Sequence, residues 1–164
     1  MIFMPRKRKV ARAPRAEVVA ALRVRRSGVH GTGVYTIRKI RKGTRIIEYA
    51  GALIRKKEAR TLPPHDPKRP YHTFYYSLEN GDVIDAGNRG NVARWINHSC
   101  DPNCTTEEEE NRIFVEALRT IYAGEELFYD YSIDPGERRT KAVEKAYACF
   151  CGSPQCRGSM LGPK

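Results

Sequence analysis

The sequence has no long hydrophobic run, no internal repeat and no cysteine in its first 99 residues. The longest uncharged apolar stretch near the N-terminus covers residues 18–22, which is too short to cross a bilayer. Arginine and proline stand where a signal peptide would have its apolar segment. The absence of heptads and solenoid periods excludes coiled-coil and repeat proteins. The 164 residues therefore predict an intracellular globular protein of one domain, with room for a tail.

Acidic residues are scarce at the N-terminal end. Residues 1–26 contain nine basic side chains and one acidic one, whereas residues 27–164 contain 21 basic and 18 acidic side chains. The first 17 residues include the run Arg6-Lys7-Arg8-Lys9 and two prolines, which predicts a flexible basic arm. Two interpretations of this arm remain open. It makes an electrostatic contact with nucleic acid or an import receptor, or it is a solvated tail that aids solubility.

Short β-rich runs separated by glycine and proline turns dominate the rest of the chain. They predict strands at residues 18–26, 45–49, 73–78, 83–85, 113–117 and 126–129. The pair Asn80-Gly81 predicts a hairpin turn between the third and fourth of these strands. Helices are expected only at residues 54–62, 91–96 and 139–147. Many short strands with few short helices predict a β-dominated α+β domain.

All five cysteines lie in the last 65 residues, and their number is odd. In a reducing compartment, clustered thiols indicate a metal site more often than disulfides. Cys149, Cys151 and Cys156 offer three ligands from one loop, whereas a structural zinc ion needs four. No histidine follows Cys156, so the fourth ligand is expected upstream, where Cys100 and Cys104 are the only thiols. Unpaired structural cysteines are the alternative.

Two further segments carry polar groups in unusual density. Residues 94–104 contain too many turn-forming residues for a long helix and too many polar groups for plain core. One interpretation of Asn97-His98 is that their side chains make hydrogen bonds to nearby backbone groups. Their position beside a candidate metal ligand instead favours a functional site. In residues 126–131, the two-residue period of a regular strand places Tyr129 and Tyr131 on the same face. Ordinary strand aromatics are the alternative there.

Along the chain stand the motifs His30-Gly31-Thr32-Gly33, Glu48-Tyr49-Ala50-Gly51, Val83-Ile84-Asp85-Ala86, Gly90-Asn91-Val92-Ala93-Arg94, the run from Asn97 to Cys104, Gly124-Glu125-Glu126-Leu127 and Tyr129-Asp130-Tyr131. In this order, and together with the cysteine loop, they resemble a SET domain followed by a post-SET zinc segment, the fold of protein-lysine methyltransferases. The similarity covers residues 20–160 approximately, and it is greatest to the mixed-lineage-leukaemia/trithorax type. The cysteine-rich pre-SET region of other branches has no counterpart here, because no cysteine precedes Cys100.

The resemblance implies an arm at residues 1–17, a SET domain at 18–133, and a linker helix with a post-SET zinc segment at 134–164. It also implies a knot-like threading of the segments 97–104 and 126–131. The implied methyl donor is S-adenosylmethionine, and the implied metal is a structural Zn²⁺ ion. The residues expected to bind the donor are His30, Gly31, Thr32, Gly33, Phe74, Arg94, Asn97, His98 and Phe150. The implied zinc ligands are Cys100, Cys149, Cys151 and Cys156.

The implied reaction is an in-line displacement at a methyl carbon. A free lysine has a pKa of about 10.4, so its amine is mostly protonated at neutral pH and cannot attack. A narrow apolar channel and the sulfonium charge of the donor favour the neutral amine, and alignment is the remaining need. By resemblance Tyr131 is the main catalytic tyrosine and Tyr49 is a channel wall. Tyr129 occupies the family's phenylalanine/tyrosine switch position, which predicts mono- or dimethylation, mainly the former.

The resemblance further implies a protein substrate with a target lysine, in a histone tail or another basic protein. Relatives of this type often depend on activating subunits, and no membrane partner is expected. An intracellular location in the nucleus, on chromatin or on a nucleoid is expected, with the cytoplasm as the alternative. Two hypotheses compete with the enzyme: a catalytically silent SET module that binds basic tails or nucleic acid, and a nucleic-acid binder stapled by zinc.

Overall fold

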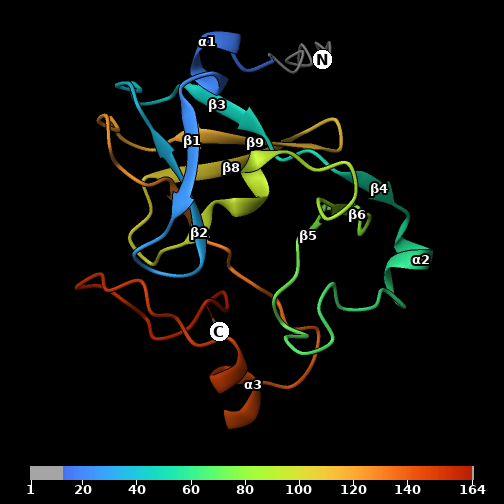
Figure 1. The fold of residues 1–164 in the computed structure, drawn as a ribbon. Coiled ribbons are helices and arrows are strands. Elements are labelled where there is room, and N and C mark those ends of the chain that lie inside the picture. Colours follow the sequence, from blue (N-terminus) through green and yellow to red (C-terminus); the bar gives the residue numbers. More distant parts are fainter. Residues whose placement is uncertain (1–12, 164) are drawn as a thin grey trace, which may run out of the picture.

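The computed structural model describes residues 13–163, so the basic run at residues 6–9 lies outside the described part of the chain. Within this range the secondary structure consists of short strands, three short α-helices and one 3₁₀ helix, which confirms the β-dominated α+β class (Figure 1). No helix in the described range is both long and apolar enough to span a membrane. The domain boundaries predicted at residues 17 and 133 stay predictions.

The described strands are β1 (Leu22–Arg26), β2 (Thr32–Thr36), β3 (Arg45–Glu48), β4 (Ala52–Ile54), β5 (Tyr75–Ser77), β6 (Val83–Asp85), β7 (Asn97–His98), β8 (Cys104–Glu109), β9 (Arg112–Ala117) and β10 (Phe128–Tyr129). They form four small sheets. β1 and β2 pair in an antiparallel sheet, β3, β9 and β8 form a second one in that order, and β4, β6 and β5 form a third. β7 and β10 pair in parallel.

The strand predictions agree with the structure in their central residues. The predicted turn at Asn80-Gly81 does join two antiparallel strands, β5 and β6, and Gly81 has a φ of +86° that favours glycine. The strand expected to begin at residue 18 begins at Leu22 instead, because the preceding residues form the single-turn helix α1 (Ala16–Val19). Residues 16–20 are rich in alanine and valine, and neither residue type decides between helix and strand over so short a run.

The helix predictions were right in place and too generous in length. The helix expected at residues 54–62 is only α2 (Lys56–Ala59), because Ile54 belongs to β4. The expected helix at residues 91–96 is the 3₁₀ helix η1 (Val92–Trp95), which the Asn91 side chain caps. The C-terminal helix α3 (Lys141–Ala146) is capped by the Thr140 hydroxyl. None of the α-helices is long enough to be stable without packing.

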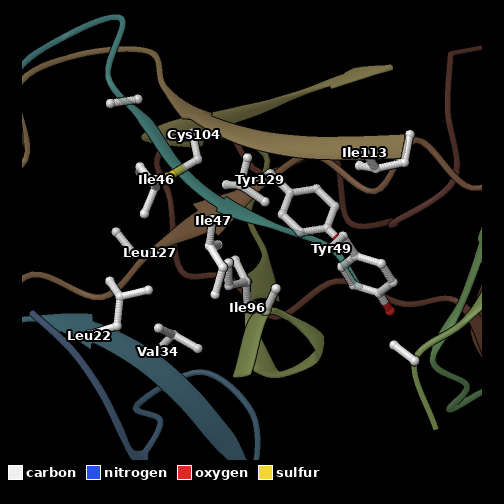
Figure 2. Close-up of a cluster of buried hydrophobic side chains, with 14 of the residues drawn as sticks. Leu22, Val34, Ile46, Ile47, Tyr49, Ile96, Cys104, Ile113, Leu127 and Tyr129 are labelled. Carbon is white, nitrogen blue, oxygen red and sulfur yellow. The ribbon is translucent and has the colours of Figure 1, made fainter. Parts of the chain in front are cut away.

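The hydrophobic core lies between β1–β2 and the β3–β9–β8 sheet (Figure 2). Ile46, Val34, Leu127 and Ile96 are at most 1 % exposed there. Tyr49 and Tyr129 belong to the same cluster and lie at one end of it in Figure 2. The core therefore extends up to residues with a predicted catalytic role.

Asn103 ties the segments 97–104 and 126–131 together. Its amide nitrogen donates to the Glu126 carbonyl oxygen over 2.8 Å, and its side-chain oxygen accepts from the Phe128 amide over 2.8 Å. The parallel register aligns Phe128 with Asn97 and Tyr129 with His98. The structure thus places the two predicted site segments side by side. The knot-like threading expected from the resemblance stays a prediction.

The chain after β10 forms a separate lobe around α3, drawn at the bottom of Figure 1. Isolated bridges join Ile133 to Leu161 and Ala148 to Ser159, so this lobe closes on itself. Only three of its described residues are buried: Val143, Cys149 and Leu161. Apolar burial alone gives this lobe little stability.

Candidate active site

The structure brings together the four cysteines that the resemblance implies as zinc ligands. The sulfur atoms of Cys100, Cys149, Cys151 and Cys156 all lie within 4.8 Å of one another. A tetrahedral zinc–thiolate site with bonds of about 2.3 Å needs sulfur atoms about 3.8 Å apart. The Sγ atoms of Cys100 and Cys149 are 3.7 Å apart. The cluster therefore fits a zinc ion in both ligand type and spacing.

Backbone amides surround these sulfur atoms, as a thiolate cluster requires. The amide of Arg157 donates to Cys100 Sγ over 3.3 Å, and that of Gly158 donates to Cys156 Sγ over 3.4 Å. The Arg157 guanidinium also makes a bidentate ion pair with Asp130, with N–O distances of 2.7 and 2.9 Å. The loop that carries three cysteines is thereby attached to the end of β10.

Cys104 lies outside the cluster. It begins β8, is fully buried in the hydrophobic core, and its thiol contacts the side-chain oxygen of Asn103. Burial raises the pKa of this thiol to about 12, so it stays protonated at neutral pH. Of the two upstream thiols that spacing left open, only Cys100 reaches the metal centre.

His98 connects the metal centre to Tyr131. Its Nε2 lies 3.4 Å from Cys100 Sγ, and its Nδ1 accepts the backbone amide hydrogen of Tyr131 over 3.0 Å. Because Nδ1 accepts a hydrogen bond, the ring proton of the neutral imidazole is on Nε2 and points toward the Cys100 sulfur. Burial lowers the pKa of His98 to about 4, against the opposing effect of Asp130. The imidazole is therefore neutral near pH 7.

The three predicted tyrosines lie in one aromatic group. The rings of Tyr129 and Tyr131 are 5.0 Å apart, which agrees with their predicted common face. Tyr131 donates its hydroxyl hydrogen to the Ile96 carbonyl over 2.7 Å, and Tyr49 donates to the Phe74 carbonyl over 3.0 Å. The Tyr129 hydroxyl makes no hydrogen bond within residues 13–163. Two of the hydroxyls are therefore fixed in direction, and the third is available to a ligand.

These tyrosines do not act as bases at neutral pH. Burial raises the pKa of Tyr49, Tyr129 and Tyr131 above the usual value for a phenol, and the neighbouring tyrosines raise the pKa of Tyr129 further. A neutral phenol offers an acceptor oxygen and one donor hydrogen. The group can align an amine and exclude water from it, but it does not remove the proton.

The glycine turn before β2 is held by Asn97. The Asn97 amide nitrogen lies 3.1 Å from the His30 carbonyl oxygen and 2.9 Å from that of Thr32. Gly31 has a φ of +52°, and a Cβ built on it would meet nothing within 4 Å. The turn thus needs glycine for its backbone angle and leaves open space beside it, as the approach of a ligand requires.

The Glu126 carboxylate also supports this turn, and the sequence did not predict this role. Glu126 accepts hydrogen bonds from Tyr35 (2.8 Å), Asn97 (3.0 Å) and Ser27 (3.1 Å). A Cβ on Gly33 would lie 2.0 Å from Glu126 Oε1, so Gly33 leaves the room that the carboxylate occupies. Glu126 stood in a recognised motif, but its three partners are up to 99 residues away, and no spacing signal predicts them.

Arg94 contributes a cation to the same region. Its guanidinium lies 4.9 Å from the Trp95 ring and 5.7 Å from the Phe74 ring. Its Nε is buried and has no hydrogen-bond partner among the described residues. His72 bridges from Phe74 to His30, with ring distances of 5.5 and 5.4 Å. Ring contacts therefore link Phe74 and Arg94 to the glycine turn through His72, and their role in donor binding stays a prediction.

Phe150 stands apart from this group. It is 78 % exposed, the most exposed large hydrophobic side chain in the described range, and it directly follows Cys149 of the cysteine cluster. No ring contact joins it to the other predicted donor-binding residues within residues 13–163. Its expected role at the donor site stays a prediction.

Comparison with known proteins agrees with this geometry. The SET-domain sequence profile matches residues 31–132, which is more than half of the chain. The chain belongs to the SET-domain family. It is 40 % identical over 136 residues to the histone-lysine N-methyltransferase trr of Drosophila melanogaster. It is 39 % identical over 138 residues to the H3 lysine-4 specific histone-lysine N-methyltransferase of Saccharomyces cerevisiae.

These alignments cover most of this chain but only a small part of each relative. They include 80 % and 81 % of this SET chain, but only 5 % and 12 % of the fly and yeast proteins. Histone-lysine N-methyltransferase trithorax of Drosophila virilis is 39 % identical over 80 % of this chain, which spans 3 % of the fly protein. The resemblance to the trithorax type is thereby confirmed for the SET domain itself.

Proposed function

We propose that this SET domain transfers a methyl group from S-adenosylmethionine to the ε-amine of a lysine in a protein. The observation that carries the proposal is the convergence of Tyr49, Tyr129 and Tyr131 beside Asn97 and His98. S-adenosylmethionine supplies a methyl group on a sulfonium ion, which an amine can attack directly. The identity to histone-lysine N-methyltransferases supports the same chemistry.

The residues around the glycine turn suit the amino-acid end of this donor. Because the Asn97 amide nitrogen faces three oxygen atoms, its side-chain oxygen points away and can accept from an ammonium group. The Glu126 carboxylate adds negative charge next to it. The Arg94 guanidinium adds a positive charge that suits a carboxylate. This domain therefore offers complementary charges to a zwitterion.

The tyrosine group would receive the lysine. The Tyr131 ring packs on His98 at 5.3 Å, and its hydroxyl is held by Ile96. Buried rings disfavour the ammonium form of the lysine, so the amine loses its proton to solvent before it attacks. The nitrogen then bonds to the methyl carbon as the carbon–sulfur bond breaks. The tyrosines contribute alignment and exclusion of water.

The Tyr129 hydroxyl supports a limit on the number of methyl groups. It has no partner within the described chain, so it can hydrogen-bond the amine or a water molecule beside it. That bond would take up the space of a second or third methyl group. We therefore propose mainly monomethylation, with dimethylation as the minor product.

The zinc ion would act structurally. Cys100, Cys149, Cys151 and Cys156 would supply all four ligands, which leaves no open position for a reacting group. The ion would hold the C-terminal lobe against β7 and β10, next to the donor site. Phe150 and the post-SET loop would then close over one side of the donor.

The names of the relatives describe them as histone-lysine N-methyltransferases. A histone tail or another basic protein is therefore the proposed substrate here. A location on chromatin or a nucleoid goes with this substrate. Activating subunits are proposed by analogy with the trithorax type. An electrostatic contact of the basic arm with nucleic acid is proposed from its charge.

The first test is to incubate the purified chain with S-adenosylmethionine and core histones, and to count added methyl groups by mass spectrometry. We expect one methyl group on lysine, and a loss of about 100-fold in rate for Tyr131→Phe. The control is Tyr122→Phe, because Tyr122 is 57 % exposed and lies outside the tyrosine group.

Calorimetric titration with S-adenosylmethionine separates the remaining outcomes. Donor binding without transfer to histones would indicate another substrate or a missing subunit. If the native chain bound no donor at all, the enzyme would be rejected in favour of a silent binding module.

A further inference from the structure

The positive charge of this chain is not confined to the arm. Residues 1–44 contain thirteen basic side chains and one acidic one, Glu17. Residues 45–164 contain 17 basic and 18 acidic side chains, which leaves them almost neutral. The whole net charge of +11 is therefore carried by the first 44 residues, of which residues 13–44 are folded and described.

The described basic residues of this part are all exposed. Only Arg15 makes an ion pair, at 3.6 Å from Glu17, within the range that the structure describes. By contrast, Arg45, Arg55, Arg69, Arg112, Arg119 and Arg157 in the rest of the chain are each paired with a carboxylate. The eight side chains, which we call the basic surface, are Arg15, Arg23, Arg25, Arg26, Arg38, Lys39, Arg41 and Lys42.

These residues lie on one continuous piece of the fold. β1 pairs along its whole length with β2, and the chain turns from β2 into β3 through residues 37–44. The amide of Ile37 donates to the Ala21 carbonyl over 2.9 Å, which attaches this turn to the start of β1. In Figure 1 α1, the start of β1 and the connection between β2 and β3 lie at the same end of the molecule.

The fold fixes the positions of several of these charges. Arg25 lies 5.9 Å from the Tyr35 ring, and the Arg23 guanidinium donates to the Ala20 and Leu22 carbonyls over 2.8 Å. Gly43 turns the backbone with a φ of +75°, and its amide donates to the Ala117 carbonyl over 2.8 Å. Lys39 lies 5.4 Å from the exposed Tyr122 ring. The basic surface is thus an ordered part of the domain.

We propose that the basic surface binds the phosphate backbone of double-stranded DNA. Duplex DNA presents one negative charge per about 1.7 Å of its axis, which suits a surface whose one acidic neighbour within residues 13–44 is Glu17, paired with Arg15. Six of the eight side chains are arginine, whose planar guanidinium binds phosphate with two hydrogen bonds.

The other polyanions fit less well. Insertion into a membrane needs an amphipathic helix or an apolar patch. Here α1 has four residues, and the exposed large apolar side chains on α1, on β1 and in residues 37–44 are Val19, Val24 and Ile37. No base-reading helix is present among the described residues, so the binding is expected to be independent of DNA sequence. The domain would then be held close to proteins that are themselves bound to DNA.

The test measures binding of the full chain to a fluorescent 20-base-pair duplex by anisotropy at several salt concentrations. The test variant carries Arg38→Gln, Lys39→Gln and Lys42→Gln. Its matched control carries Lys57→Gln, Arg60→Gln and Lys68→Gln, which removes the same charge from exposed positions near α2. Loss of three phosphate contacts reduces the slope of log K against log salt by about 2.7. The control is expected to keep the native slope.

Three results would overturn the proposal. Equal losses in both variants would show that only net charge matters. An unchanged slope in the test variant, with all binding lost on deletion of residues 2–12, would assign DNA to the arm alone. Equal or tighter binding to single-stranded RNA, polyglutamate or phosphatidylserine vesicles would reject duplex DNA as the partner. Unchanged circular dichroism spectra and urea unfolding of both variants verify folding, and none of these results depends on donor binding or methyl transfer.

Discussion

The tyrosine group and the cysteine cluster meet at His98, yet they are held in place by different forces. Tyr49 and Tyr129 are 4 % and 6 % exposed and belong to the hydrophobic core. The lobe that carries Cys149, Cys151 and Cys156 has only three buried residues of its own within the described chain. Apolar burial therefore stabilises the tyrosine group, whereas the C-terminal lobe depends on the Arg157–Asp130 ion pair and on the metal ion that its cysteines could hold. A substitution in the core should therefore lower the stability of the whole domain, whereas loss of the metal should affect mainly the C-terminal lobe.

The largest effect is expected from the core. Ile46→Ala removes a fully buried side chain and should lower the free energy of unfolding by about 2–5 kcal/mol. Val143→Ala, in α3 of the C-terminal lobe, is the matched change outside the core. Urea unfolding followed by circular dichroism measures both. An equal loss for Val143→Ala would mean that the lobe and the core unfold as one unit.

Removal of the metal comes second. Chelation, or Cys149→Ser, should detach the C-terminal lobe and abolish donor binding, because Cys100, His98 and Tyr131 are linked in series. The main thermal transition should move by less than about 4 °C, since the core is untouched. Zinc analysis, calorimetry and thermal unfolding give the three readouts. Cys104→Ala keeps all four ligands and should retain one zinc ion per chain.

One result of metal removal would contradict this expectation. A demetallated chain with normal donor affinity and normal turnover would show that the lobe needs no metal. The difference between the two regions would then have to be ascribed to the ion pair alone.

A smaller effect is expected behind the glycine turn. Glu126→Gln keeps the shape of the side chain but removes the charge that accepts from Tyr35, Asn97 and Ser27. Loss of a hydrogen bond to a charged group should weaken donor binding about tenfold. Calorimetric titration measures this change without any substrate. Glu125→Gln is the control, because Glu125 pairs with Arg119 on the surface, and identical effects would exclude a positioning role for Glu126.

The smallest change in rate should accompany the clearest change in product. Tyr129→Phe removes a hydroxyl that has no partner in the described chain, so folding should be unaffected. Without that hydroxyl the channel accepts additional methyl groups, and di- and trimethyl-lysine should replace the monomethyl product. Mass spectrometry of the modified histone measures the distribution. A product pattern like that of the native chain would refute the assignment of Tyr129 as the switch.

The sequence predicted the parts of this architecture that depend on local spacing. Three cysteines in one loop, the Asn80-Gly81 turn and the common face of Tyr129 and Tyr131 are all encoded within a few residues. Local spacing could not decide whether Cys100 or Cys104 is the fourth ligand of the cluster. The answer follows from β8, which carries Cys104 into the core.

Long-range pairing explains what the sequence did not reveal. The partners of Glu126 come from three segments that meet only in the folded state, and no periodicity relates them. The lengths of α1 and α2 were also beyond local propensity, because single-turn helices are set by the strands on either side of them. The continuation of positive charge past residue 26 was present in the sequence, but its exposure became evident only from the structure.

The parallel pairing of β7 with β10 has a consequence for how the protein is made. Two residues of each strand, separated by 29 intervening residues, bring His98 beside Tyr129. During synthesis β7 leaves the ribosome before β10, so His98 is exposed until Tyr129 has been made. Contacts of this separation form late, because loop closure must come first. The tyrosine group is therefore completed only when residues 128–131 are available, whereas the β1–β2 hairpin can form before them.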